Sequence, residues 1–535
     1  MKSLAKLVAV AWALPAALLA TSTAFAEDPP AASTEPPPAQ PPKGYIPGSR
    51  RSIALGLSPF APTGPTPPGG ATIPYSAPEP AGNDFEFNFG GYMSAALRLS
   101  VGGREHATPE QFGTTLHAPP QTPDIYGAVQ GTNAPQGSWV ELRFDYGNRI
   151  VKSVVKLSTW KPTSGQSWFE TGSQNFVNEA FLVYTLPDGG DLSLTWTVGA
   201  FRNSYGTLGQ YGAGQYNAAI IGSPFGVGET LSLKYALSDS FSLIAEHGLM
   251  GRLGKVPIGA APNVFDHGPS PSRPSSFVNH AHVGFTSNGD VPFVLGLHYL
   301  YNWAQDERDQ IDDPKTPLLD EGRRPDPRMT VWGVDWRMID NYLGNFAIAA
   351  SYADATYADL LTGLNYYGAD TGELLTKRLL GEQGGGTGKL LIAGFEYNFS
   401  WAKYLWYPQA FWGDGPDLIT SVFANAGIVR ESRDPSFDRR KLYKLGAEVT
   451  YRCLPWFAIS GRYDHVAPNS KDLDESFDVI SPKLIFRSNW NSHEQVTLAY
   501  TRWFYGPHTK GEAPNDYTHE ELDDQMFSLS FGMWW

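Results

Sequence analysis

Acidic and basic residues recur at every second position in several short segments of this 535-residue chain. In the segment 140–146, Glu141, Arg143 and Asp145 alternate with apolar residues. A period of two places successive side chains on opposite faces of a β-strand. Opposed charges that share one face either orient a polar or charged solute passing between them, or pair with one another and stiffen the wall.

The same pattern places further charged residues opposite apolar neighbours. If the apolar faces meet lipid, each Lys or Arg on that side costs about 2–4 kcal/mol near the midplane of the bilayer, so we expect the charges to face a pore. The expected pore-lining residues are Glu86, Arg98, Glu141, Arg143, Asp145, Lys152, Lys156, Asp335, Arg337, Lys444, Glu448, Arg452 and Arg462.

Three tyrosines lie in the glycine-rich stretch 203–228, namely Tyr205, Tyr211 and Tyr216. A flexible backbone with amphipathic rings suits a constriction that contacts solutes. Two interpretations stay open: the stretch folds inward and narrows the pore, or it caps the strands from outside.

Catalytic motifs are absent from the sequence. It has no metalloprotease helix motif, nucleophile elbow, phosphate-binding loop with its lysine, or complete calcium loop. His280 and His282 share a strand face, but two histidines without a third ligand are usually polar wall residues. We therefore expect no enzymatic activity, no cofactor and no bound metal.

Strands with one apolar and one polar face must position these residues. The clearest is 526–535, and similar alternation occurs at 192–200, 231–237, 295–303, 443–453 and 457–463. Each is about as long as the roughly 9–11 residues that cross a bilayer as a tilted strand. In 526–535 one face carries Phe527, Leu529, Phe531, Met533 and Trp535, and the other carries Ser528, Ser530 and Gly532.

The connections between strands alternate between short and long. Short turns are expected at 147–148, 187–190, 238–240, 287–290, 341–345 and 454–455, and long segments at 102–137, 161–173, 203–228, 253–275, 304–328, 359–388 and 505–524. Short turns at one end and long loops at the other are typical of outer-membrane barrels. We expect an all-β, antiparallel up-and-down transmembrane barrel of about 18 strands (16–18) with both termini at the short-turn end. A barrel of that size encloses an aqueous channel unless it is plugged.

The aromatic segment 400–417 fits this scheme least well, and it is either an interfacial girdle or an unrecognised hairpin. Residues 1–26 match a secretory signal peptide. Residues 27–83 are rich in proline and are expected to form a disordered arm, either a spacer or a tether. The barrel is expected to span 84–535.

Composition supports export to a membrane. Aromatic residues make up 13% of the chain, yet the mean hydropathy is negative, as expected when half of each strand is polar. The single cysteine, Cys453, excludes an intramolecular disulfide. A formal charge of −14 argues against nucleic acid as a partner and weakly favours attraction of cations.

Taken together, the signal peptide, the succession of strands and the terminal aromatic residue resemble Gram-negative outer-membrane porins. Gly91-Tyr92, the strand number and the ending Met533-Trp534-Trp535 are similar to maltoporin-type sugar channels. That resemblance implies a homotrimer of 18-stranded pores in outer-membrane lipid, with an aromatic slide along each lumen. The single cysteine leaves no disulfide-bearing loop, and the proline-rich arm is a further departure from the family.

The expected function is passive diffusion of small hydrophilic solutes, with carbohydrates as one solute class. The alternative is a non-conducting structural or adhesive barrel that acts through its extracellular loops.

Overall fold

The computed structural model describes the strands and several of their connections. The described residues are 85–100, 139–160, 175–186, 191–208, 218–252, 276–287, 293–304, 327–340, 344–367, 369–371, 375–381, 383–401, 417–454, 456–467, 469–471, 473, 476–488, 494–505 and 524–534. The chain divides into two units, Met1–Tyr45 and Ile46–Trp535, and the described residues belong to the second. The expected signal peptide, the proline-rich arm and most of the aromatic segment 400–417 lie outside them. Within the described residues, no helix is long and apolar enough to cross a membrane.

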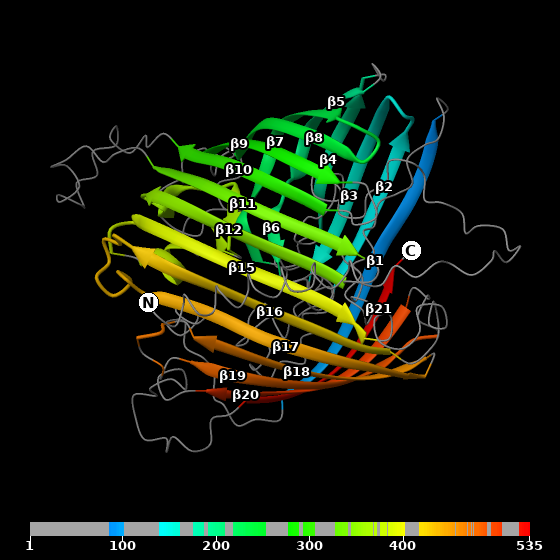
Figure 1. Cartoon of the computed structure of the whole chain (residues 1–535), viewed down its shortest axis with the longest axis vertical. Coiled ribbons are helices and arrows are strands. Elements are labelled where there is room, and N and C mark those ends of the chain that lie inside the picture. Colours follow the sequence, from blue (N-terminus) through cyan, green and yellow to red (C-terminus); the bar gives the residue numbers. More distant parts are fainter. Residues whose placement is uncertain are drawn as a thin grey trace, which may run out of the picture. The chain divides into compact units, whose positions relative to one another are not determined.

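Strands make up most of the described structure (Figure 1). They are β1 (Glu86–Ser100), β2 (Trp139–Gly147), β3 (Val151–Trp160), β4 (Asn175–Thr185), β5 (Leu192–Arg202), β6 (Tyr205–Leu208), β7 (Ala218–Ala236), β8 (Phe241–Arg252), β9 (Ser276–Ser287), β10 (Phe293–Ala304), β11 (Arg328–Asp340), β12 (Gly344–Thr356), β13 (Leu364–Tyr366), β14 (Ala369–Asp370), β15 (Gly388–Ser400), β16 (Asp417–Arg430), β17 (Lys441–Leu454), β18 (Phe457–Ala467), β19 (Phe477–Phe486), β20 (Glu494–Tyr505) and β21 (Asp524–Trp534). Two short helices, η2 (Ala358–Leu360) and η3 (Thr376–Leu380), lie between β12 and β15.

Eighteen of these 21 strands form a closed antiparallel ring; β6, β13 and β14 lie off it. Each ring strand pairs with the ring strand before it and the one after it. The ring closes because β1 also pairs with β21, where Tyr92 lies opposite Trp534; Figure 1 shows these first and last strands in blue and red. The expected up-and-down barrel is confirmed.

Both ends of the ring lie at the short-turn end, as expected. Glu86, the first residue of β1, is paired with Gly147, which immediately precedes the short connection between β2 and β3. Met533, near the end of β21, is paired with Glu494, the first residue of β20. The chain therefore enters and leaves the barrel at the same end.

The outer face of the ring is apolar. Val227 and Leu297 are 67% and 61% exposed, and Trp332, Val449, Ile459 and Phe531 are also exposed. Along β18, exposed residues alternate strictly with buried ones from Ala458 to Asp464. The strand period seen in the sequence thus separates an outward apolar face from an inward polar one, and charged side chains fall mainly on the inner face.

Two connections fold against the inner face and build an apolar core there. β6 and the first half of β7 form the first of them, and its Ile221 side chain lies against Gly333 of β11. The Ser351 hydroxyl of β12 donates a hydrogen bond to the carbonyl of Ile220 at 2.5 Å. We call the described residues 203–208 and 218–226 the first inner segment.

The described residues between 357 and 387 form the second inner segment. Its strand β13 pairs with β7, where Leu364 lies opposite Pro224. Leu364, Leu375 and Leu380 are fully buried in the same core as Ile220. The sequence predicted only a long polar loop at 359–388, and this was wrong in one respect. Apolar residues of the segment pack in one core with residues of the wall and of the first inner segment, so the segment lies within the ring.

Candidate functional site

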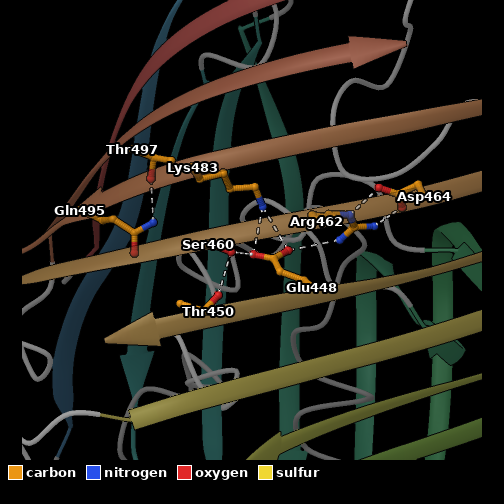
Figure 2. A network of polar contacts seen from close by, with 8 residues as sticks. All are labelled: Glu448, Thr450, Ser460, Arg462, Asp464, Lys483, Gln495 and Thr497. Carbon is orange, nitrogen blue, oxygen red and sulfur yellow. Dashed lines mark hydrogen bonds and ion pairs between the residues drawn. The ribbon is translucent and has the colours of Figure 1, made fainter. Parts of the chain in front are cut away.

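A network of charged and polar side chains lines the inner face of β17 to β20 (Figure 2). Lys483 Nζ of β19 donates to both carboxylate oxygens of Glu448 on β17, at 3.0 and 3.1 Å. Arg462 Nη1 of β18 lies 3.5 Å from Glu448 Oε2. The strand register explains this arrangement, because Glu448 lies directly opposite Arg462 and Lys483 lies opposite Ser460.

Hydroxyl and amide groups extend the network. Thr450 donates to Ser460 at 2.8 Å, and Ser460 donates to Glu448 Oε1 at 2.8 Å. Gln495 donates to Thr497 at 3.0 Å on β20. The Glu448 carboxylate therefore accepts hydrogen bonds from a hydroxyl and an ammonium group while it faces a guanidinium, which holds it in one orientation.

Arg462 is the most enclosed cation of this network. Its guanidinium donates to Asp464 in a bidentate geometry, Nε to Oδ2 at 2.7 Å and Nη2 to Oδ1 at 2.5 Å. Both side chains are 1% exposed. The guanidinium carbon also lies 4.4 Å from the ring centre of Phe423 on β16. Bidentate pairing and the ring face offset the cost of removing both charges from water.

A second group of ion pairs occupies the inner face of β2 to β4. Arg143 Nε lies 2.9 Å from Asp145 Oδ1 on the same strand, and Lys156 Nζ lies 3.1 Å from Glu179 Oε1 on β4. All four side chains are buried. Arg143, Lys156 and Glu179 share one row across the sheet, so two basic residues on neighbouring strands are balanced by Glu179 on β4 and by Asp145, two residues along β2.

Tyr205 covers a third polar group, on β8 to β11. Its hydroxyl donates to Glu246, and its ring centre lies 4.9 Å from that of His298. His298 Nε2 and Asp335 Oδ1 are 2.5 Å apart, and the His298 and His282 rings stack with their centres 4.3 Å apart. Tyr205 therefore belongs to an inner segment that packs on this wall, whereas Tyr211 and Tyr216 lie outside the described residues.

His280 and His282 both lie on the inner face of β9. His280 Nε2 contacts Thr230 Oγ1 at 3.1 Å and Asn203 Nδ2 at 3.3 Å. Within the described residues, no group of three or more His, Cys, Asp or Glu side chains is placed to hold a metal ion. The expectations of no metal, no cofactor and no enzymatic activity stay predictions.

The second inner segment meets the polar wall at Tyr367. The Tyr367 hydroxyl donates to Asn425 of β16, and Lys444 Nζ lies 5.7 Å from the ring centre. The φ of Tyr367 is 53°, in the left-handed region that a tyrosine seldom adopts, so the surrounding contacts hold it there. Burial raises the pKa of both Tyr366 and Tyr367 well above the ordinary phenol value.

The connection 431–440 holds the second inner segment in place. Arg433 Nη1 donates to the Tyr357 hydroxyl at 2.8 Å. Asp434 Oδ2 accepts from the backbone N–H of Gln383 at 3.2 Å, and Ser432 donates to the carbonyl of Leu380 at 2.7 Å. The second inner segment thus contacts the wall through Tyr367 and the connection 431–440 through Tyr357.

Some of the other residues predicted from the sequence have described side chains, and their position on a strand face can be given. Lys152, Lys444 and Arg452 are half-buried on the inner face. Arg337 and Glu396 also face inward. Both lie in the row of Ala347, and Arg337 is two residues along β11 from Asp335. Glu86 is exposed at the short-turn end. Arg98 and Glu141 lie in β1 and β2, but their side chains lie outside the description.

Several charged residues of the inner face were missed by sequence reasoning. Lys234 lies in a predicted strand, on the other face of that strand from Leu231 and Leu233. The period of two was therefore sufficient to find it. Asp464 follows Arg462 by two residues and carried the same signal. Glu179 and Lys483 lie in strands β4 and β19, whose alternation is weaker, and their partners are set by strand register that a single sequence does not reveal.

Comparison with known proteins gives fold likeness only. No family model matches the sequence, and neither does any curated protein. Solved structures with a similar fold include the outer membrane channel DcaP of Acinetobacter baumannii, at 10% identity and a TM-score of 0.37 over 86% of this chain and 100% of that chain. Outer-membrane expressed OmpT of Vibrio cholerae gives 8% identity and a TM-score of 0.34 over 85% and 100%. OprB of Pseudomonas putida, in a high-pH structure, gives 11% identity and 0.33 over 85% and 94%. These scores are too low to carry a conclusion about function.

Proposed function

We propose that this chain is a channel of a Gram-negative outer membrane, through which small hydrophilic solutes diffuse passively. The observation that carries this proposal is the closed 18-strand ring with apolar side chains exposed outside and ion-paired side chains inside. A ring leaves no unpaired strand edge in lipid. Eighteen strands enclose more space than their own side chains fill.

The two inner segments support a narrowed channel rather than a wide one. They pack into a core on the inner face of β8 to β12 and β15 to β19, which includes Leu442, Val466, Phe477 and Val479. The polar network lies further along β17 to β19 and on β20. A solute would then pass beside the charged wall formed by β1 to β4 and β17 to β21. Carbohydrates are one class that such a wall of carboxylates, amides and hydroxyl groups accommodates by hydrogen bonding.

A second candidate function rests on the burial of inner charges. Arg143, Asp145, Lys156 and Arg462 are all buried, as expected if the ring interior is filled. Such a barrel would be non-conducting and would act through its outer loops as a structural or adhesive protein. Assembly as a homotrimer is a further part of the proposal that either function accommodates.

Ionic current distinguishes the two functions. Purified full-length protein would be added to a planar lipid bilayer in potassium chloride, with folding checked by strand-type circular dichroism and protease resistance. Discrete current steps support the channel. Folded protein that inserts without carrying current would leave the non-conducting barrel as the function. Swelling of protein-containing liposomes in uncharged sugars then tests whether carbohydrates pass.

A further inference from the structure

Three buried histidines of the wall lie under the tyrosine of the first inner segment. The ring centre of Tyr205 is 5.9 Å from those of His280 and His282, and 4.9 Å from that of His298. The three histidines are between 0% and 5% exposed, and the Tyr205 hydroxyl donates to Glu246. The first inner segment therefore closes over imidazoles, the side chains whose charge in water changes near neutral pH.

Two of these rings stack on each other. The rings of His282 and His298 are 13° from parallel, and their centres are 4.3 Å apart. His282 lies directly opposite His298 on β10 and opposite Glu246 on β8, and His298 Nε2 contacts Asp335. Nearly parallel rings direct their nitrogen lone pairs along separate planes, so the pair is not arranged to share a metal ion. Positive charges on both rings would repel each other at this separation.

Two carboxylates face the three imidazoles, Glu246 on β8 and Asp335 on β11. Two inward cations follow on neighbouring strands: Lys234 lies two residues along β7 from Ser232, which is opposite Glu246, and Arg337 lies two residues along β11 from Asp335. The described part of the first inner segment and the described inner face of β12 add no charged side chain. Protons on all three rings would therefore place three positive charges beside two negative ones, in a buried environment.

His280 joins the first inner segment through a hydrogen bond of its own. His280 Nε2 lies 3.3 Å from Asn203 Nδ2 and 3.1 Å from Thr230 Oγ1. An amide nitrogen only donates, so Nε2 is the acceptor and carries no hydrogen in this arrangement. A proton on Nε2 would bring two N–H donors face to face. Acid thus disturbs the contact of Asn203 as well as adding charge beneath Tyr205.

We propose that acid releases the first inner segment from the wall and so widens the channel. When the segment is docked, it encloses positive charge that the two carboxylates only partly balance. When it is released, water and salt anions reach the same groups. Docking is therefore strongest while the rings are neutral, and it weakens as the pH falls. This inference rests on the proposed channel function and adds its regulation by pH.

Current per channel measures the release. Full-length protein in a planar bilayer would be recorded at constant potassium chloride while the pH is lowered from about 7.5 to about 5, the range in which imidazoles usually gain protons. The current should rise, and it should return when the pH is restored. A current that stays unchanged or falls over this range would overturn the inference and leave the channel function intact.

A disulfide across the docking contact separates movement of the segment from other effects of acid. A Cβ at Gly333 would lie 2.6 Å from the Ile221 side chain, so cysteines at the two positions are close enough to be bridged. With Cys453 replaced by Ser, the oxidised variant Ile221→Cys, Gly333→Cys should lose the rise in current, and reduction should restore it. A rise that persists in the oxidised variant would overturn the inference, because the segment cannot leave the wall.

Matched histidine variants test the stacked pair. His282→Phe keeps an aromatic ring in the stack but cannot take up a proton, so the rise in current should be smaller than in wild-type protein. His247 is exposed on the outer face of β8, and His247→Phe should leave the rise unchanged. Equal rises in the two variants would contradict the role given to His282. If His282→Phe does not fold, the cysteine variant still decides.

Hydrogen exchange follows the segment without any current. After correction for the intrinsic pH dependence of exchange, the amides of residues 218–226 should exchange faster at about pH 5 than at about pH 7.5, relative to those of β18. No acceleration would count against the release of the segment. If the folded protein carries no current at any pH, the channel function fails, and exchange alone then decides whether acid releases the segment.

Discussion

The hydroxyl groups of Tyr366 and Ser351 lie 2.9 Å apart, and they join the second inner segment to the wall strand β12. Ser351 also donates to the carbonyl of Ile220 in the first inner segment. One wall serine therefore contacts both inner segments at the point where they pack on each other. Tyr366 and Ser351 are both buried, so breaking these hydrogen bonds would leave buried polar groups without partners and would cost free energy.

Packing between the first inner segment and the wall predicts the effect of enlarging Gly333. A Cβ at this position would come within 2.6 Å of the Ile221 side chain. Gly333→Val should therefore destabilise the barrel by about 1–3 kcal/mol through overpacking, and displace the segment so that current per channel rises. Urea unfolding in lipid vesicles and single-channel recording measure the two effects. Gly461→Val is the control, since nothing lies within 4 Å of a Cβ there; equal costs at both positions would argue against the packing described here.

Alkaline pH should loosen the second inner segment. Burial raises the pKa of Tyr366 and Tyr367 above the ordinary value of 10.0. Below pH 10 both phenols are protonated whether or not the segment is docked, so the free energy of docking does not depend on their ionisation. Above it, the undocked phenols release protons more readily than the docked ones, so stability is lost as the pH rises.

We expect the channel current to increase reversibly above about pH 10 in wild-type protein. Replacing both Tyr366 and Tyr367 by Phe removes the protons involved and should abolish the increase. The current is recorded over a pH series at constant salt. An increase of the same size in the double variant would show that other groups cause it.

Removal of one buried charge should cost far more than removal of an exposed one. Asp464→Asn removes the bidentate carboxylate partner of Arg462, whose side chain is only 1% exposed. The variant should destabilise the barrel by about 3 kcal/mol or more. Glu431→Gln removes the partner of Lys389, but the Glu431 side chain is 69% exposed, so the loss of stability should be much smaller. Urea unfolding of both variants compares the two costs, and similar values would contradict the placement of Arg462 in a dry environment.

A charge on the outer face tests contact with lipid. Leu297 lies near the middle of β10 and is 61% exposed. Leu297→Arg should destabilise the folded protein in lipid vesicles by about 2–4 kcal/mol. Leu473, which is 58% exposed in the connection after β18, is the control. Leu473→Arg should change stability by less than about 0.5 kcal/mol, and equal effects would place both leucines in the same solvent.

Sequence reasoning reached the barrel because strand alternation survives in a single chain. The outward row Phe527, Leu529, Phe531 and Met533 lies where its period placed it, and β1 closes on this strand. The strand number followed from connection lengths. Local side-chain order was therefore sufficient for the ring and for the inward placement of Arg143, Glu448 and Arg462.

Contacts between segments that are distant in the chain could not be predicted from the sequence. The leucines at 364, 375 and 380 have neither a strand nor a long helical period, so the core that they build with Ile220 left no local signal. The pairing of Lys156 with Glu179, and of Lys483 with Glu448, depends on strand register. Burial of the acidic members likewise depends on what packs over them, and that was not visible in composition.

Spin labels along β7 provide the most direct test of a barrel with lipid outside and water inside. With Cys453 replaced by Ser, single cysteines would be introduced in turn at Leu231, Ser232, Leu233, Lys234 and Tyr235, and the labelled protein reconstituted in lipid vesicles. Labels at 231, 233 and 235 should be relaxed by lipid-soluble oxygen, and labels at 232 and 234 by a water-soluble nickel complex, because exposure alternates along this strand. Relaxation that does not alternate, or outward positions shielded from oxygen, would contradict the account.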